Sequence, residues 1–261
     1  VNMIDPYHLE TYGVTTVNYN RDVEIFPVLN AMFERIQGVS PYKSPTDMGV
    51  NMAGYCIMDD EVCREASRQE IIRRYYNTMC ALKRGDAEQS AVNKIELLMS
   101  KAGVTSEDRP VVAAALGVEE RTGAPGAAIQ LPDGTIVTGK TSSLLGCTAG
   151  MLLNALKALG GVNQELDLLS KVVIEPLQDL KVNYLGSRNP RLHTDEILQA
   201  LSICAATNPL AKLALEQLKK LRGCEAHSSV ILSRVDERTL RKLGINLTCE
   251  PKHEGQNLYH R

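Results

Sequence analysis

The sequence predicts an α/β protein in which a helical N-terminal layer, residues 1–122, precedes a three-layer α/β domain, residues 123–261. Apolar residues recur at helical spacing through most of the first region. A Gly-Ala-Pro-Gly stretch at 123–126 ends that pattern, and helical segments separate the short β-prone runs that follow, which is typical of three-layer folds. A chain of 261 residues is long enough for two modest domains with a substantial core.

The clearest helical pattern of the first region covers residues 25–37, and Gly38 provides its C-terminal stop. Its apolar residues recur three or four positions apart, which places them on one face of a helix. This stripe consists of Ile25, Val28, Leu29, Met32, Phe33 and Ile36. Further helices are expected at 61–84, from Asp86 to about 102, and from Thr105 or Ser106 onward, with Pro110 in the first turns.

The second region opens with a predicted β-hairpin. Two β-prone runs, 127–131 and 135–138, flank Pro132-Asp133-Gly134, which is a turn sequence. The elements expected after it are helices at 144–159, 171–185, 195–206 with Thr194 as N-cap, 209–221 with Asn208 as N-cap and Pro209 at the first helical position, and 236–243, and strands at 228–233 and 245–249.

The string from Gly134 to Thr141 satisfies the phosphate-loop pattern G-x-x-x-x-G-K-[ST]. A true phosphate loop lies between a strand and a helix, whereas the four residues between these glycines are β-branched and favour an extended strand. The sequence therefore favours the hairpin over the phosphate loop. Anion binding by Lys140, Thr141, Ser142 and Ser143, just before a predicted helix, stays open.

Composition narrows the classes of partner. The formal net charge is −2 with acids and bases interspersed, so no basic face for nucleic acid is expected. The apolar runs are far shorter than the roughly 20 residues that span a bilayer, so no membrane partner is expected. Seven cysteines without a C-x-x-C pair indicate reduced thiols in a cytoplasmic protein. Cys224 and His227 lack the second ligand pair of a zinc site, so no metal is expected.

The irregular stretch at 40–54 concentrates polar groups on a loop, where ligand-binding residues are often found. We expect Lys43, Ser44, Thr46 and Asn51 to contact a ligand, with Lys43 meeting an anion, and Asp47 to act as a catalytic base or a metal ligand. The alternative is a solvated turn in which an aspartate caps a helix.

A second candidate segment lies just before the helix expected at 195–206. Arg188, Arg191 and His193 combine two guanidinium groups and an imidazole with a helix N-terminus, an arrangement that suits a phosphate or a carboxylate. His193 is the catalytic candidate of this segment. The alternative is a capped helix start with surface arginines.

Several stretches resemble the bacterial family called domain of unknown function eighteen-forty-six. They are Val1 to Glu10, Asn18 to Asn30, Ser44 to Gly54, Gly139 to Gly146, Asn189 to Glu196 and Ala205 to Pro209. The resemblance covers essentially the whole chain and implies that it is the C-terminal half of a protein twice as long.

The same resemblance implies a topology similar to the cytidine deaminase fold without its zinc site. At the two positions where cytidine deaminases carry their zinc ligands and catalytic glutamate, this sequence reads Cys147-Thr148-Ala149 and Thr207-Asn208-Pro209-Leu210. Deaminase chemistry is therefore not carried over.

The functional expectation is binding of, or enzymatic action on, a phosphorylated or nucleotide-like small molecule, together with an N-terminal half of the same protein. The chain is also expected to form a homo-oligomer. The alternative is a non-catalytic scaffold or oligomerisation module. The residues specify neither a reaction nor a cofactor.

Overall fold

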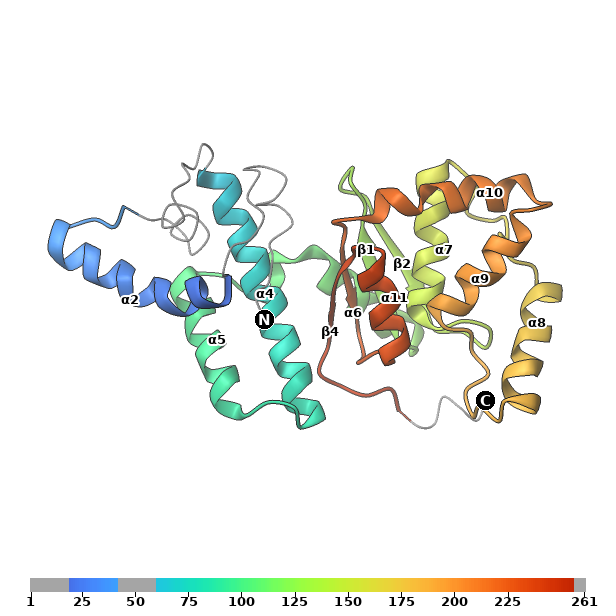
Figure 1. Cartoon of the computed structure of the whole chain (residues 1–261), viewed down its shortest axis with the longest axis horizontal. Coiled ribbons are helices and arrows are strands. Elements are labelled where there is room, and N and C mark those ends of the chain that lie inside the picture. The colour runs from blue at the N-terminus through green and yellow to red at the C-terminus, as the bar shows by residue number, and fades with distance from the viewer. Residues whose placement is uncertain (1–18, 42–59, 256–261) are drawn as a thin grey trace. The chain divides into compact units, whose positions relative to one another are not determined.

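The computed structural model describes residues 19–41 and 60–255 (Figure 1). The chain divides into two compact units. The first unit comprises Val1–Thr78 and Gly85–Arg109, and the second comprises Met79–Arg84 and Pro110–Arg261.

The described part of the first unit is helical. Its elements are α2 (Tyr19–Gln37), α4 (Asp60–Arg84, whose last turns belong to the second unit), α5 (Gln89–Ala102) and the 3₁₀ turn η1 (Ser106–Asp108). The predicted apolar stripe on α2 is not buried as a whole, because Val28, Met32 and Ile36 are exposed. The N-cap of α5 is Glu88 instead of the predicted Asp86.

The second unit contains a four-stranded mixed sheet in the order β2-β1-β3-β4. The strands are β1 (Gly126–Gln130), β2 (Ile136–Lys140), β3 (Glu225–Ser228) and β4 (Asn246–Cys249). Strand β1 is antiparallel to both of its neighbours, and β3 is parallel to β4. The start of β1 therefore lies beside the carboxyl ends of β2 and β3, at one edge of the sheet.

Helices cover both faces of this sheet, which gives the expected helix–sheet–helix layering. Helix α6 (Pro110–Thr122) packs Val111 and Ala115 against Ala128 on one face. Helix α7 (Cys147–Gly160) belongs to the large core on the other face, with Ala127 and Ile129 of β1. The remaining elements are α8 (Lys171–Asp179), the π-helical turn η2 (Leu180–Tyr184), α9 (Thr194–Cys204), α10 (Pro209–Glu216), the 3₁₀ turn η3 (Gln217–Leu221) and α11 (Arg234–Lys242).

The predicted hairpin is confirmed. Strands β1 and β2 pair directly, with Gln130 opposite Ile136, and Asp133 Oδ1 accepts a hydrogen bond of 2.9 Å from Thr135 N within the turn. The phosphate-loop pattern therefore lies in a turn and an edge strand, and not in the loop between a strand and a helix that a phosphate loop requires.

Two other boundaries differ from the sequence prediction. Strand β3 is Glu225–Ser228 instead of 228–233, because the apolar residues that follow it leave the sheet toward the start of α11. Helix α7 begins at Cys147 instead of 144, because Ser142 Oγ accepts hydrogen bonds from Leu144 N (3.2 Å) and Leu145 N (3.1 Å) and so forms a turn before the helix.

Gly139 permits the close approach of α7 to β2. A Cβ atom at this position would lie 2.1 Å from Met151 N and 2.6 Å from Cys147 O, so the helix backbone itself would have to move. We expect Gly139→Ala to lower the free energy of unfolding by about 1–3 kcal/mol, measured by urea denaturation. Gly117→Ala is the matched control, because its Cβ would meet only the flexible end of Arg121. Equal stabilities of the two variants would contradict this account of the helix–sheet contact.

No helix in the described segments combines the length and the apolar character needed to cross a lipid bilayer.

Candidate functional site

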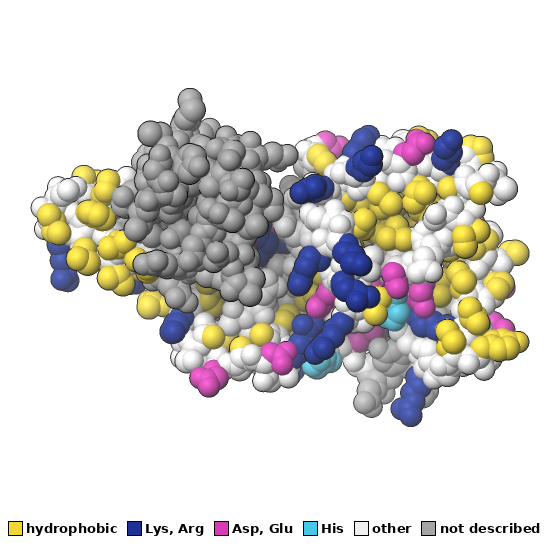
Figure 2. All heavy atoms as spheres, viewed as in Figure 1, with side chains coloured by type: hydrophobic (Ala, Val, Ile, Leu, Met, Phe, Trp, Pro, Cys, Tyr) yellow, Lys and Arg dark blue, Asp and Glu magenta, His cyan; other side chains and the backbone are white. Residues whose placement is uncertain are grey.

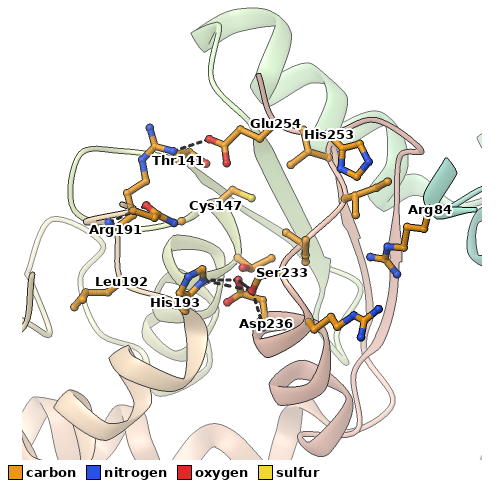
Figure 3. Close-up of a pocket in the computed structure, with 17 residues that line it drawn as sticks. Arg84, Thr141, Cys147, Arg191, Leu192, His193, Ser233, Asp236, His253 and Glu254 are labelled. Carbon is orange, nitrogen blue, oxygen red and sulfur yellow. Dashed lines mark hydrogen bonds and ion pairs between the residues drawn. The ribbon is translucent and has the colours of Figure 1, made fainter. Parts of the chain in front are cut away.

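An open cavity of about 340 Å³ lies in the second unit, at the edge of the sheet where β2 and β3 end (Figure 3). Ligands of α/β proteins commonly bind at the carboxyl ends of strands. The cavity is lined by Arg84, Thr141, Gly146, Cys147, Thr148, Asn189, Arg191, Leu192, His193, Val230, Ile231, Leu232, Ser233, Arg234, Asp236, His253 and Glu254.

Three helices begin at this cavity, each with its N-cap in the wall. The N-caps are Gly146 for α7, His193 for α9 and Ser233 for α11. A helix N-terminus carries partial positive charge and unsatisfied N–H groups. Each of the three helix ends therefore contributes partial positive charge to the cavity wall.

The chain itself caps two of these three helix starts. Asp236 Oδ1 accepts hydrogen bonds from Thr194 N (2.8 Å) and Thr194 Oγ1 (2.6 Å) at the start of α9. At the start of α11, Ser233 Oγ accepts a hydrogen bond of 3.1 Å from Asp236 N.

The start of α7 differs from the other two. Its N-cap, Gly146, has no side chain, and the backbone amides of Cys147, Thr148 and Ala149 have no acceptor among the residues that the structure describes. Gly146, Cys147 and Thr148 all line the cavity. The N–H groups of the first turn of α7 are therefore the donors that a bound anion would meet first.

His193 and Asp236 form a hydrogen-bonded pair in the cavity wall. Nδ1 of His193 lies 2.8 Å from Asp236 Oδ2, and Ser233 Oγ donates a hydrogen bond of 2.7 Å to the same oxygen (Figure 3). The buried Asp236 carboxylate is thus fixed by the side chains of three neighbours. Because the carboxylate engages Nδ1, proton exchange between His193 and a ligand would go through Nε2.

The electrostatics of this pair keep the aspartate ionised. Burial acts to raise the pKa of Asp236, but hydrogen bonds from His193 and Thr194 outweigh it and lower the pKa from 3.8 to about 2. The hydrogen bond with Asp236 raises the pKa of His193 above its usual 6.5, against the opposing effect of burial. The pair resembles the aspartate–histidine arrangement that orients a general base in hydrolases.

This coupling predicts a pH-dependent stability. The lowered pKa of Asp236 stabilises the fold by about 2 kcal/mol above pH 4, and about half of this is lost by pH 3. The raised pKa of His193 expresses the same interaction, which is present below pH 6.5 and weakens as the pH rises through the folded-state pKa. Urea unfolding of the wild type and Asp236→Asn should therefore differ most between about pH 4 and 6.5. A difference that does not change with pH would contradict the assigned ionisation.

Arginine side chains also line the cavity, and two of them form ion pairs. Arg191 is buried, and its Nη1 lies 2.6 Å from Glu254 Oε1. Arg84 pairs with Glu237 at the start of α11. Arg234 is exposed at the first position of α11. On the visible face of the second unit, basic and acidic side chains are intermixed around a histidine (Figure 2).

The structure brings three of the sequence-predicted site residues into this cavity, namely Thr141, Arg191 and His193. Four others are not among the lining residues. Lys140, Ser143 and Arg188 are exposed, and Ser142 forms the turn before α7. The five candidates of the first loop, Lys43, Ser44, Thr46, Asp47 and Asn51, lie outside the described residues.

Sequence reasoning missed several cavity residues, above all Asp236 and Glu254. Asp236 is 43 positions from His193, and only the fold brings them together. The one available signal was the Ser233-x-x-Asp236 spacing, which is typical of a helix start and gives no indication of a histidine partner.

The cavity wall also contains a buried thiol, that of Cys147. Burial raises the pKa of the Cys147 thiol to about 11, so the thiol is protonated near neutral pH and is a poor nucleophile. Within residues 19–41 and 60–255, no group of three or more His, Cys, Asp or Glu side chains is arranged to hold a metal ion.

Comparison with known proteins assigns the chain to a protein family. Residues 107–259 match the family described as "Domain of unknown function DUF1846, C-terminal", and residues 1–103 match its counterpart described as "Domain of unknown function DUF1846, N-terminal". The chain belongs to the DUF1846 family. The expectation that it corresponds to the C-terminal half alone is corrected, because its first 103 residues match the N-terminal region of the DUF1846 family.

Curated DUF1846-like relatives are similar over the whole chain. A UPF0371 protein of Corynebacterium urealyticum is 56% identical over 261 residues, which are 100% of this chain and 52% of that protein. A UPF0371 protein of Streptococcus thermophilus is 57% identical over 100% of this chain and 53% of its own length. The chain thus spans about half the length of the curated relatives it matches.

Proposed function

We propose that the cavity binds the anionic group of a phosphorylated or nucleotide-like small molecule, and that His193 transfers a proton to or from that ligand. The observation that supports this most directly is the uncapped start of α7 in the same cavity as Arg191 and His193. Helix N-termini and arginine are the groups that proteins most often use to bind phosphate.

Size and charge support the same class of ligand. Small-molecule sites usually occupy about 300–1,000 Å³, and this cavity has about 340 Å³. The Arg191–Glu254 ion pair supports the same charge preference, because the guanidinium binds a carboxylate of the chain itself. A bound phosphate would compete with Glu254 for Arg191.

His193 supplies the acid–base component of the proposal. Asp236 fixes the ring through Nδ1, and this hydrogen bond raises the pKa of the imidazole above its usual value, which favours the protonated form. In that form His193 would donate a proton from Nε2 to the ligand, and after losing it the ring could take a proton back at the same nitrogen. Binding of the ligand without any turnover would instead support a module that binds the anion but performs no chemistry.

Isothermal titration calorimetry tests the proposal with inorganic phosphate, AMP and ADP as probes. We expect saturable binding of at least one of them with a dissociation constant of about 1 mM or lower. His193→Gln should retain that binding and remove turnover of any substrate found. No heat of binding from any of the three probes at millimolar concentration would overturn the proposal.

A further inference from the structure

We propose that Lys181 is a positioning residue of the cavity, which holds the segment 191–193 so that Arg191 and His193 face the ligand. The identity of the ligand in this proposal rests on the function proposed above. The positioning role rests only on the hydrogen bonds that Lys181 forms. Lys181 does not line the cavity and lies in the π-helical turn η2.

A single buried ammonium group reaches both site residues. Lys181 Nζ donates hydrogen bonds of 2.7 Å to the carbonyl oxygen of Arg191 and 2.8 Å to Glu196 Oε2. The same Glu196 oxygen accepts a hydrogen bond of 2.6 Å from His193 N. Lys181 therefore fixes the backbone of Arg191 directly and that of His193 through one carboxylate oxygen.

The π-helical turn brings Lys181 into this position. Lys181 is buried while its neighbours Leu180 and Val182 are exposed. Leu185 N donates to Leu180 O across the turn (3.0 Å), and Ser187 N donates to Lys181 O (2.9 Å), which anchors the start of the following loop. π-Helical turns inside longer helices occur frequently at functional sites.

Gln178 of α8 forms hydrogen bonds that connect the Arg191 segment with the segment before α7. Gln178 Nε2 donates to Ser143 O (3.0 Å) and to Pro190 O (3.1 Å). These two carbonyls precede the open start of α7 and the Arg191 segment, respectively. The segment 178–181 therefore holds together the two parts of the chain that supply the proposed anion donors.

The charge of Lys181 also acts on His193. The hydrogen bond with Asp236 of α11 is the main cause that raises the pKa of His193, the charge of Glu196 of α9 acts in the same direction, and the charge of Lys181 lowers it. Arg84, Arg191, Arg234 and Glu254 also line the cavity with His193. Replacing the ammonium of Lys181 with an uncharged side chain should therefore raise the pKa of His193. A lysine that only filled space would not have this effect.

Lys157 is a matched control in the same unit. It is as buried as Lys181, at 7% exposure for each, and its Nζ likewise donates to a backbone carbonyl, Gln164 O, at 2.7 Å. It lies outside the cavity lining, and the carboxylate that acts on its charge is Asp167, which does not belong to the site segment. Both lysines thus bear the cost of burying a charge, but only Lys181 contacts the site segment.

The test compares Lys181→Met, Lys181→Arg and Lys157→Met by two readouts. One is the pKa of the His193 imidazole, followed by NMR titration, and the other is phosphate affinity by calorimetry. We expect Lys181→Met to raise the His193 pKa and to weaken phosphate binding about tenfold or more. Lys181→Arg should bring the His193 pKa and the phosphate affinity part of the way back to the wild-type values. Lys157→Met should change neither quantity.

The outcomes separate this proposal from the function on which it rests. If the pKa of His193 is the same in Lys181→Met as in Lys157→Met, the positioning role is wrong, whatever the cavity binds. If the wild type does not bind phosphate but the His193 pKa still moves in Lys181→Met and is only partly restored by Lys181→Arg, which keeps the charge, the positioning role stands and the proposed ligand is wrong. Should Lys181→Met fail to fold while Lys157→Met folds, Lys181→Gln is judged by the same two readouts.

Discussion

Arg191→Met should weaken phosphate binding about thirtyfold, because the ligand loses charge-assisted hydrogen bonds from the buried guanidinium of the cavity. Calorimetry at one fixed ionic strength measures the change, since salt screens such interactions. The methionine keeps most of the aliphatic volume, so the loss reports mainly on the charge.

Two further variants make this result specific. Arg188→Met removes the same charge three residues earlier, from an exposed side chain outside the cavity lining, and should change the affinity less than twofold. Glu254→Gln should increase the affinity, because it removes the carboxylate that competes for Arg191. Equal losses in Arg188→Met and Arg191→Met would mean that only the overall charge matters and that the cavity is not the site.

Asp236→Ala should lower the free energy of unfolding at pH 6 by about 3 kcal/mol. The buried carboxylate accepts hydrogen bonds from His193, Thr194 and Ser233, and its removal leaves these donors without their acceptor. Urea denaturation followed by circular dichroism measures the change. The same variant should lower the pKa of His193, because the group that raises it is gone.

Asp179→Ala serves as the control for this variant. Asp179 is exposed near the end of α8 and contacts Asn183 on its own helical segment, so its removal should cost less than about 0.5 kcal/mol. If Asp236→Ala were as stable as Asp179→Ala, the carboxylate would not hold the starts of α9 and α11 together.

The parts of the fold that sequence reasoning predicted correctly depend on local rules. Pro132-Asp133-Gly134 determines a turn, and Asn208-Pro209 determines a helix start, at which Asn208 Oδ1 accepts a hydrogen bond of 2.9 Å from Leu210 N. The end of β3 was predicted wrongly because Val230, Ile231 and Leu232 have β-prone side chains. In the structure these residues come after the last residue of β3 and line the cavity. Tertiary contacts, and not local β propensity, determine this conformation.

The residues of the candidate site likewise fall into those that local sequence patterns identify and those that only tertiary contacts bring together. Arg191 and His193 were identifiable because two cationic groups precede a helix start within one short segment. Thr141 was predicted as one of four polar residues just before a helix, and it alone of the four lines the cavity, because β2 ends there. Asp236, Glu254 and Lys181 act through contacts between distant segments, and local patterns do not encode such contacts.

The central claim is that the open start of α7 receives the anion. The most direct measurement is an NMR titration of the isotope-labelled chain with inorganic phosphate, followed at the backbone amides. We expect the amide resonances of Cys147, Thr148 and Ala149 to shift together and to saturate with one affinity, because these N–H groups lack an acceptor within the described structure. Saturable shifts elsewhere in the chain, with these three amides unchanged, would contradict the account.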